Sequence, residues 1–412
     1  MPLRLNKREP LNIITFTEYL FVLILILNAR TIWTSFEDSP LNRALKVAVV
    51  AVGMFYIVLL PMRAIRNILL SLVLGLIYIV AYITMGGYEP RGFIFFVFTV
   101  IAIYAFLQTA NGFGRGTELL YKYRDIILIV AAVSLVFWVL GSTLGIISPT
   151  GVAYTTWGAH NIASGVKAVP SYYGVYFETQ NLEDAFGALG YLTRNTAIFT
   201  EAPMCNFNFC MALLIELFFN PKPSKAKSVI LVAAVLSTLS TTGYCMLAIA
   251  LTAKYITSSG GTSLRSLVIL SIPLVLIAAA IAFQFLLEDK MSTGSGIDRL
   301  RDFVIGLEAW SQRPLFGYGY GAQTYYMGFH YGFSNSITPI LGHGGLFLAA
   351  PYVYCIVQWC RTCIKEKDFL KFLFFINFIF IFTITIMSYQ FLTIFVFFAY
   401  CIKREKVVKA NT

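Results

Sequence analysis

The sequence predicts an all-α, polytopic integral membrane protein. Of its 412 residues 58% are hydrophobic and 12% are charged, and the hydrophobic residues gather in long runs. Soluble proteins carry about 25% charged residues, whereas a bilayer span needs about 20 mostly apolar ones. The composition therefore argues against a soluble enzyme and predicts about twelve transmembrane helices, in a range of roughly 10–12, within a single transmembrane domain over residues 1–412.

The expected helices follow the apolar runs in chain order. These lie at about 11–29, 44–62, 68–87, 92–111, 126–148, 197–219, 228–257, 266–287, 337–360 and 369–402. The runs 228–257 and 369–402 are too long for one crossing and are interpreted as hairpins of two shorter helices. A stretch of small hydroxyl residues before Gly243 and Tyr244 interrupts the first run, and Met387 to Gln390 interrupt the second.

The basic residues set the predicted topology, because cytoplasmic loops collect Lys and Arg. With both hairpins in place, 21 of the 31 basic residues fall on the same side as the N-terminus. We therefore expect both termini in the cytoplasm. The basic residues of these loops account for the net charge of +11, so no nucleic-acid partner is expected. The seven cysteines lack the spacing of a zinc site or a disulfide framework, and no metal site is expected.

Two long segments, 149–196 and 288–335, remain outside the membrane, and we expect them to carry short helices. The first is rich in aromatic residues, among them Tyr172, Tyr173 and Tyr176. Such rings can hold the apolar face of a sugar, or they can form an interfacial aromatic belt. The sequence leaves both interpretations open.

The other ten basic residues lie outside, against the charge bias. Arg30, Arg43, Lys46 and Arg91 lie in short loops and are interpreted as ordinary interfacial charges. Four arginines lie in or beside the long segments, where their donors suit a phosphate group: Arg194, Arg299, Arg301 and Arg313. For Arg313, pairing with nearby carboxylates is the favoured interpretation.

Glu201 follows Arg194 by seven residues, at the start of an apolar run. If this stretch is helical, two turns place both side chains on one face. An ionisable residue entering the membrane is a candidate functional residue, and Glu201 would act as a general base or orient the arginine. Glu18 and Glu216 also lie in apolar runs, but near their ends, where a structural role is favoured.

Several short motifs now resemble one known family. They are Arg194 to Pro203, the Ser/Thr-rich break at 237–244, Arg299 to Phe303, Arg313 to Gly321, Ser334-Asn335-Ser336 and Gly344-Gly345. Their order over roughly residues 150–350 resembles the O-antigen ligase and polysaccharide polymerase (Wzy-type) family. The resemblance implies a bacterial plasma (inner) membrane glycosyltransferase that joins oligosaccharide units carried on undecaprenyl diphosphate, without nucleotide sugar, metal or other cofactor. A flippase and a chain-length regulator would be its possible partners.

The resemblance also implies roles for single residues. Arg194 and Arg299 fall where the family's essential arginines lie, and Glu201 or His330 would accept the proton of the acceptor hydroxyl. Substrate binding would involve Arg301, Tyr172, Tyr173, Tyr176, Asn335 and Tyr244. The chain departs from the family at Ser334-Asn335, where many relatives have a His-Asn pair, and at the 240–243 break, which lacks an arginine.

Two other functions stay open. Ligase-type transfer of a finished glycan would use the same chemistry. A lipid-linked oligosaccharide flippase would also be polytopic, but it would carry charges through most of its spans, whereas here the unusual charges cluster at the outer ends of a few.

Overall fold

The computed structural model describes residues 13–36, 40–60, 65–85, 90–158, 164–181, 193–258, 294–322 and 335–403. Within these ranges six helices are long and apolar enough to cross a membrane: α2 (Pro40–Leu59), α3 (Ile65–Thr84), α4 (Pro90–Gly112), α5 with the π-helical turn η2 (Gly116–Thr143), α6 with the π-helical turn η4 (Ala202–Phe219) and α11 (Ile337–Glu366). Shorter apolar helices are α1 (Ile13–Leu27), α12 (Phe369–Thr383) and α13 with the 3₁₀ turn η6 (Phe391–Cys401). The predicted class of membrane protein is supported, while the run at 266–287 lies outside the described residues.

Both long apolar runs are broken where the sequence predicts. The first forms α7 (Lys225–Ser237) and α8 (Thr241–Ser258), and the second forms α12 and α13. Each pair turns back on itself. Asn195 contacts the end of α7, whereas Lys254, late in α8, donates to the carbonyl of Leu217 at the opposite end of the bundle.

The basic connections gather at one end of the bundle, which we call the basic end. Hydrogen bonds join the α4–α5 connection to the C-terminal segment, through Asn111 to Cys401 and Thr117 to Lys403. Lys371, at the start of α12, donates to the carbonyls of Tyr400 and Ile402. The sequence predicts that all these segments share one side of the membrane, and a common end of the bundle agrees with this.

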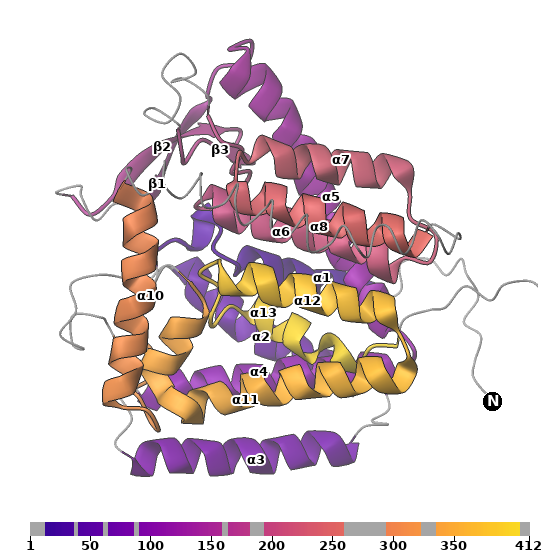
Figure 1. The fold of residues 1–412 in the computed structure, drawn as a ribbon, viewed down its shortest axis with the longest axis vertical. Coiled ribbons are helices and arrows are strands. Elements are labelled where there is room, and N and C mark those ends of the chain that lie inside the picture. The colour runs from indigo at the N-terminus through magenta and orange to yellow at the C-terminus, as the bar shows by residue number, and fades with distance from the viewer. Residues whose placement is uncertain are drawn as a thin grey trace, which may run out of the picture.

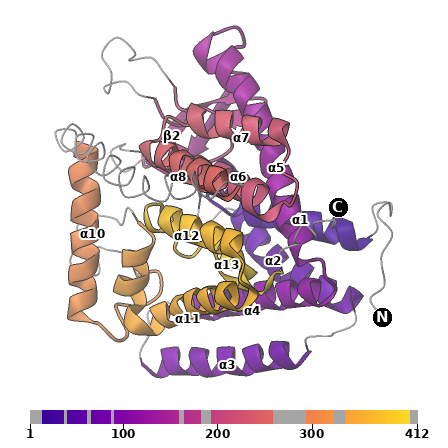
Figure 2. The same ribbon diagram turned by 45° about the vertical axis from the view of Figure 1, so that its right-hand side comes forward.

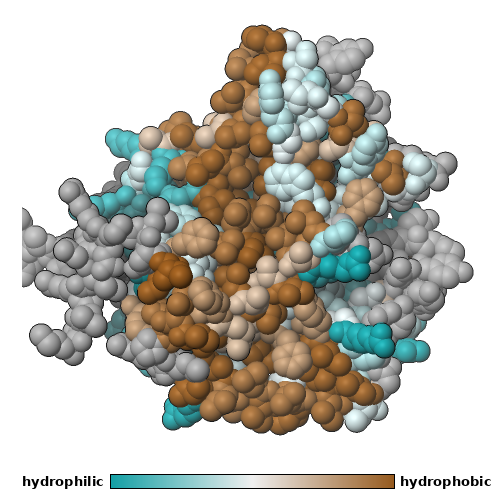
Figure 3. Space-filling view, turned by 180° about the vertical axis from the view of Figure 1, so that it is seen from behind, coloured by the Kyte–Doolittle hydropathy of each residue, from teal (hydrophilic) through white to brown (hydrophobic). Residues whose placement is uncertain are grey.

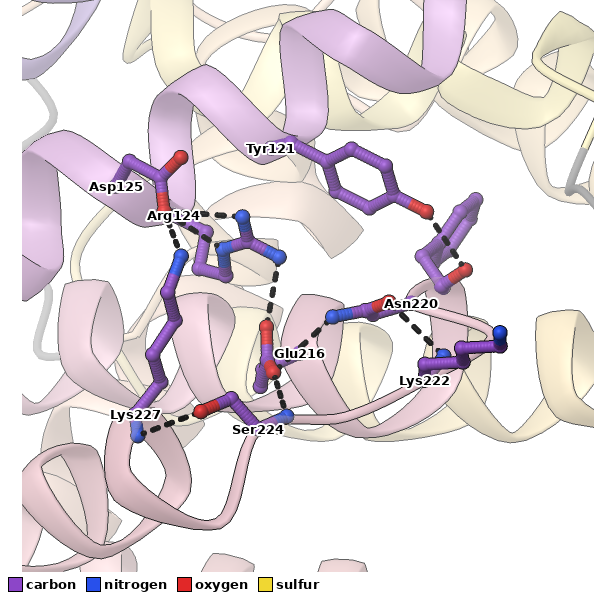
Figure 4. Close-up of polar contacts among 9 residues, drawn as sticks. Tyr121, Arg124, Asp125, Glu216, Asn220, Lys222, Ser224 and Lys227 are labelled. Carbon is purple, nitrogen blue, oxygen red and sulfur yellow. Dashed lines mark hydrogen bonds and ion pairs between the residues drawn. The ribbon is translucent and has the colours of Figure 1, made fainter.

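Buried ion pairs hold the helices together at this end (Figure 4). Arg124 on α5 donates to Glu216 of η4 at 2.7 Å, and Glu216 also accepts from Asn220 and from the backbone N–H of Ser224. Glu18 on α1 is likewise fully buried and binds Arg115 and Lys122. A buried carboxylate is tolerated only when it is paired, so these contacts explain how Glu18 and Glu216 fit within apolar helices and support their structural interpretation.

The opposite end, which we call the sheet end, carries a small antiparallel sheet. Its strands are β1 (Gly151–Thr155), β2 (Lys167–Tyr172) and β3 (Tyr176–Phe177), in the order β1-β2-β3. We expected short helices in segment 149–196, and its described residues form strands instead. The turn between β2 and β3 explains this in part, because Tyr173 and Gly174 both have positive φ, which a helix excludes.

Helix α10 (Gly294–Gln312) runs across the ends of the other helices. Figures 1 and 2 show it nearly perpendicular to α3, α4 and α11, on the side of the molecule that carries the sheet. Its Gly306 packs against Thr338 near the start of α11. This placement is typical of a helix that lies along a membrane surface.

The surface and the centre of the bundle are both apolar. Figure 3 shows hydrophobic side chains over most of one face, with polar ones toward its edges. At the centre, 94% of the residues of α6 and η4 are buried, and the side chains of Asn206, Asn208 and Glu216 are enclosed with the apolar ones. Helix α6 therefore anchors the fold, and its first turn faces the sheet end.

Candidate functional site

A buried strap, residues 193–200, leads from the sheet to α6. Asn195 donates to the hydroxyls of Ser134 and Ser237, and Thr196 donates to the carbonyl of Phe177. Ala197 has φ 47°, a conformation that L-residues rarely adopt. The strap is not helical, so our premise of two helical turns between Arg194 and Glu201 is wrong.

Arg194 is nevertheless held firmly in this strap. Its Nε donates to the carbonyl of Thr238 at 3.0 Å, and its Nη1 donates to Oε1 of Gln180 at 3.4 Å. Thr238 belongs to the break between α7 and α8, where some backbone carbonyls have no N–H donor within a helix. These two contacts fix the orientation of the guanidinium, and Arg194 as a whole is half-buried.

Glu201 lies beside this arginine without a helical path between them. Oε1 of Gln180 also accepts the backbone N–H of Ala202 at 3.0 Å, so one side-chain oxygen joins Arg194 to the start of α6. Glu201 is the N-cap residue of α6, and its carbonyl accepts from Met204 and Cys205. Its side chain does not cap the helix, and the positive N-terminal end of the helix dipole stabilises the carboxylate.

Tyr244 completes this group. It lies one turn into α8, is 41% exposed, and is within electrostatic range of Arg194. Gly243 is required here, because a side chain at that position would collide with Asn206 of α6. We call Gln180, Arg194, Glu201, Thr238 and Tyr244 the Arg194 cluster.

The tyrosines of the sheet have separate environments. Tyr172 and Tyr176 are buried, and both pack on Phe137. Tyr172 donates to Glu178 at 2.6 Å, and burial together with this carboxylate raises the pKa of Tyr172. These two rings serve the packing of the sheet, whereas Tyr173, whose ring also lies 6.0 Å from that of Phe137, is 68% exposed and open to a ligand.

The arginines of the second outer segment lie on α10. Arg301 is half-buried and its neighbour Asp302 is buried, on the helix that packs against α11. Arg299 is part of α10, but its side chain lies outside the described residues, as does His330. Arg313 is exposed and its guanidinium lies 4.5 Å from the ring centroid of Tyr318. Among the described side chains Arg313 therefore has a local contact with an aromatic ring in place of the carboxylate that we expected.

Asn335 has a local role at the start of α11. Its Oδ1 accepts the backbone N–H groups of Ile337 and Thr338 at 3.0 and 2.9 Å, and its Nδ2 donates to the hydroxyl of Thr338. These are helix-capping bonds. They fix Asn335 to the first turn of α11, where Thr338 packs against Gly306 of α10.

Two glycine motifs that are separate in sequence meet at a break in α11. The helix is interrupted at Gly345, which has φ 54° and ψ −148°. Backbone N–H groups of Tyr318 and Gly319 donate to residues 342 and 343, and those of residues 346 and 347 donate to 314 and 315. The 314–319 segment thus pairs with the unwound backbone of α11. A Cβ at Gly317 or Gly345 would collide with the backbone of the segment opposite. Non-helical backbone within a membrane is tolerated only when it is paired in this way or lines a cavity.

Arg30, which the sequence suggested was an ordinary interfacial charge, connects the segment before α6 to the break between α12 and α13. Its Nε donates to the carbonyl of Ile386, and its guanidinium lies 4.2 Å from the ring centroid of Trp157. Its carbonyl accepts from Thr200, beside Glu201. Ile386 lies in the break between α12 and α13, and Ser336 bonds to Thr385 and Met387 of that break. A continuous set of contacts therefore runs from the Arg194 cluster to the start of α11. No signal in the sequence would have identified Arg30.

The sequence matches no protein-family model, and neither curated proteins nor solved structures give a match. A function must therefore be inferred from the residues of the chain itself.

Proposed function

We propose that the protein is a polysaccharide polymerase of the plasma membrane, which joins oligosaccharide units carried on undecaprenyl diphosphate. The observation that carries the proposal is the Arg194 cluster. An arginine of fixed orientation lies at the sheet end beside an acidic residue at a helix N-terminus, and exposed Tyr244 lies within electrostatic range of the arginine. A lipid diphosphate at a membrane surface needs such a preorganised cation.

In the proposed reaction, a hydroxyl oxygen of the acceptor unit attacks the anomeric carbon of the donor chain. The bond from that carbon to the diphosphate oxygen breaks, and its electron pair stays on the diphosphate. Arg194, with Arg299 from α10, would stabilise this negative charge. Glu201 would take the proton of the attacking hydroxyl, with His330 as the alternative base, and Tyr173 and Arg301 would contact the sugars or phosphates.

The proposal includes a topology. The basic end would face the cytoplasm, together with both chain termini, and the sheet end would face outward. The pairs α7–α8 and α12–α13 would each enter and return as hairpins, which gives about twelve spans when the run at 266–287 is added. The clustering of the basic connections at one end supports this assignment.

Incubation of the purified protein with a lipid-linked repeat unit, without nucleotide sugar, tests the proposal. A polymerase would give a ladder of chain lengths and release lipid diphosphate. A single transfer to another lipid would instead indicate the ligase alternative. Transport of the unit across a vesicle membrane with no new glycosidic bond would identify a flippase and reject both enzymes.

A further inference from the structure

A cavity of about 820 Å³ lies along one side of α3. Ligand pockets have volumes of about 300–1,000 Å³, so the space is large enough for a bound molecule. Helices α4, α11 and α13 form its other walls, and most of the lining is aliphatic or aromatic, including Leu74, Ile101, Leu348, Ile394 and Phe397. None of the Arg194 cluster lines it.

The cavity is closed toward the sheet end. Its lining extends along α3 from Asn67 to Ala81, which is about 21 Å of helix. Directly beyond, Tyr82 stacks on Phe93 with ring centroids 3.8 Å apart, and its hydroxyl accepts the backbone N–H of Tyr320. A molecule in the cavity therefore cannot continue to the outer surface along α3.

The other end of the cavity approaches the basic end. Tyr400 lines the cavity, and its carbonyl accepts from Lys371 of the basic end. Arg66, which is exposed, directly precedes the lining residue Asn67. The cavity is thus apolar, with an exposed cation next to one end of its lining and stacked aromatic rings beyond the other.

We infer that this cavity binds one acyl chain of an anionic phospholipid, whose phosphate lies near Arg66. The hydrocarbon core of a bilayer is about 30 Å thick, so one leaflet supplies chains of about 15 Å, which fit within the length of the cavity along α3. A lipid diphosphate held at Arg194 would have its head group at the opposite end of the molecule. The inference is therefore independent of the proposed function.

Native mass spectrometry of the full chain in detergent, with added lipid, tests this inference. Phosphatidylglycerol should bind with one tight site, and more strongly than phosphatidylcholine. Leu74→Trp, which fills the cavity, should weaken that site about tenfold, and Ala350→Trp on the opposite wall should do the same. Arg66→Gln should lower the preference for phosphatidylglycerol about fivefold.

Leu69→Trp is the matched control, because Leu69 lies on α3 with 54% exposure, close to the 56% of Leu74, and does not line the cavity. It should leave binding unchanged. Equal binding by all four variants and the unaltered protein would overturn the inference. It would also be overturned if an added polyprenyl phosphate displaced phosphatidylglycerol from the site that Leu74→Trp removes. Unfolding temperatures of the variants show whether each remains folded.

Discussion

Arg194 gains its importance from what holds it rather than from its charge alone. Arg301 and Arg313 also lie at the sheet end, yet Arg313 is exposed and its guanidinium lies against the ring of the nearby Tyr318. Arg194 has two bonds from one guanidinium to different elements, the α7–α8 break and the segment after β3. Such fixed donors stabilise charge in a transition state without reorganising.

Arg194→Ala should therefore slow chain lengthening about 10²- to 10³-fold, the usual effect of removing one preorganised donor. Arg194→Lys should restore little, because lysine retains the charge but lacks the planar fork. The ladder assay measures both rates. Arg313→Ala is the control and should stay within about threefold of the unaltered protein; a loss there as large as at Arg194 would contradict the assignment.

Residue patterns in this sequence predict where helices break, but not the local backbone conformation between them. The hydroxyl-rich break before Gly243 was predicted because such residues can bond freed backbone groups internally. The strap at 193–200 was not, because the positive φ of Ala197 depends on contacts with Asn195 that no sequence period reveals. Likewise, Tyr172 and Tyr173 are adjacent in sequence, and only the fold shows that one is buried and the other exposed.

Among the elements, α11 shows how the fold compensates for a broken helix. Pro351 has no N–H, so the carbonyl of Phe347, four residues earlier, loses its helical donor. The hydroxyl of Tyr78 on α3 supplies the missing bond at 2.8 Å, and its ring stacks on Phe347. Tyr78 of α3 thus satisfies a backbone carbonyl of α11 that has lost its helical donor.

Tyr78→Phe should destabilise the protein by about 1–3 kcal/mol, because it leaves this carbonyl without its donor. The same substitution in a Pro351→Ala background should cost much less, since residue 351 then provides its own N–H. Denaturant unfolding in detergent micelles gives all four stabilities of this cycle. Equal costs in the two backgrounds would show that the hydroxyl does not replace the missing amide.

At the scale of the whole molecule, the two ends are built differently. The basic end is held by side-chain ion pairs between helices, and the sheet end mainly by backbone hydrogen bonds between irregular segments. Carboxylates without partners are costly in an apolar bundle. Removing one partner of an ion pair should therefore cost more stability than replacing both partners.

Glu216→Ala should cost about 3–5 kcal/mol, because it leaves Arg124 buried without its main partner. Replacing both by apolar residues, Arg124→Met with Glu216→Leu, should cost less than the single change. Lys227→Met breaks the more exposed pair with Asp125 and should cost less than about 1 kcal/mol. Unfolding midpoints in urea compare the three proteins, and a double variant less stable than Glu216→Ala would refute the pairing argument.

The proposed topology predicts opposite accessibility of the two ends. In a background without native cysteines, Tyr154→Cys on exposed β1 should react with a membrane-impermeant maleimide added to intact cells. Lys222→Cys, at the basic end, should react only after the membrane is opened. The reverse pattern would place the sheet in the cytoplasm and exclude a polymerase that works on the outer face.

The contact between Arg30 and Ile386 has a consequence for biosynthesis. The two residues are 356 positions apart, so Arg30 leaves the ribosome long before its acceptor exists. The turn after α1 therefore cannot reach its final form until the last hairpin has been inserted. A nascent chain stopped before residue 386 would be incomplete at its beginning as well as at its end, which gives cellular quality control an early segment by which to recognise unfinished copies.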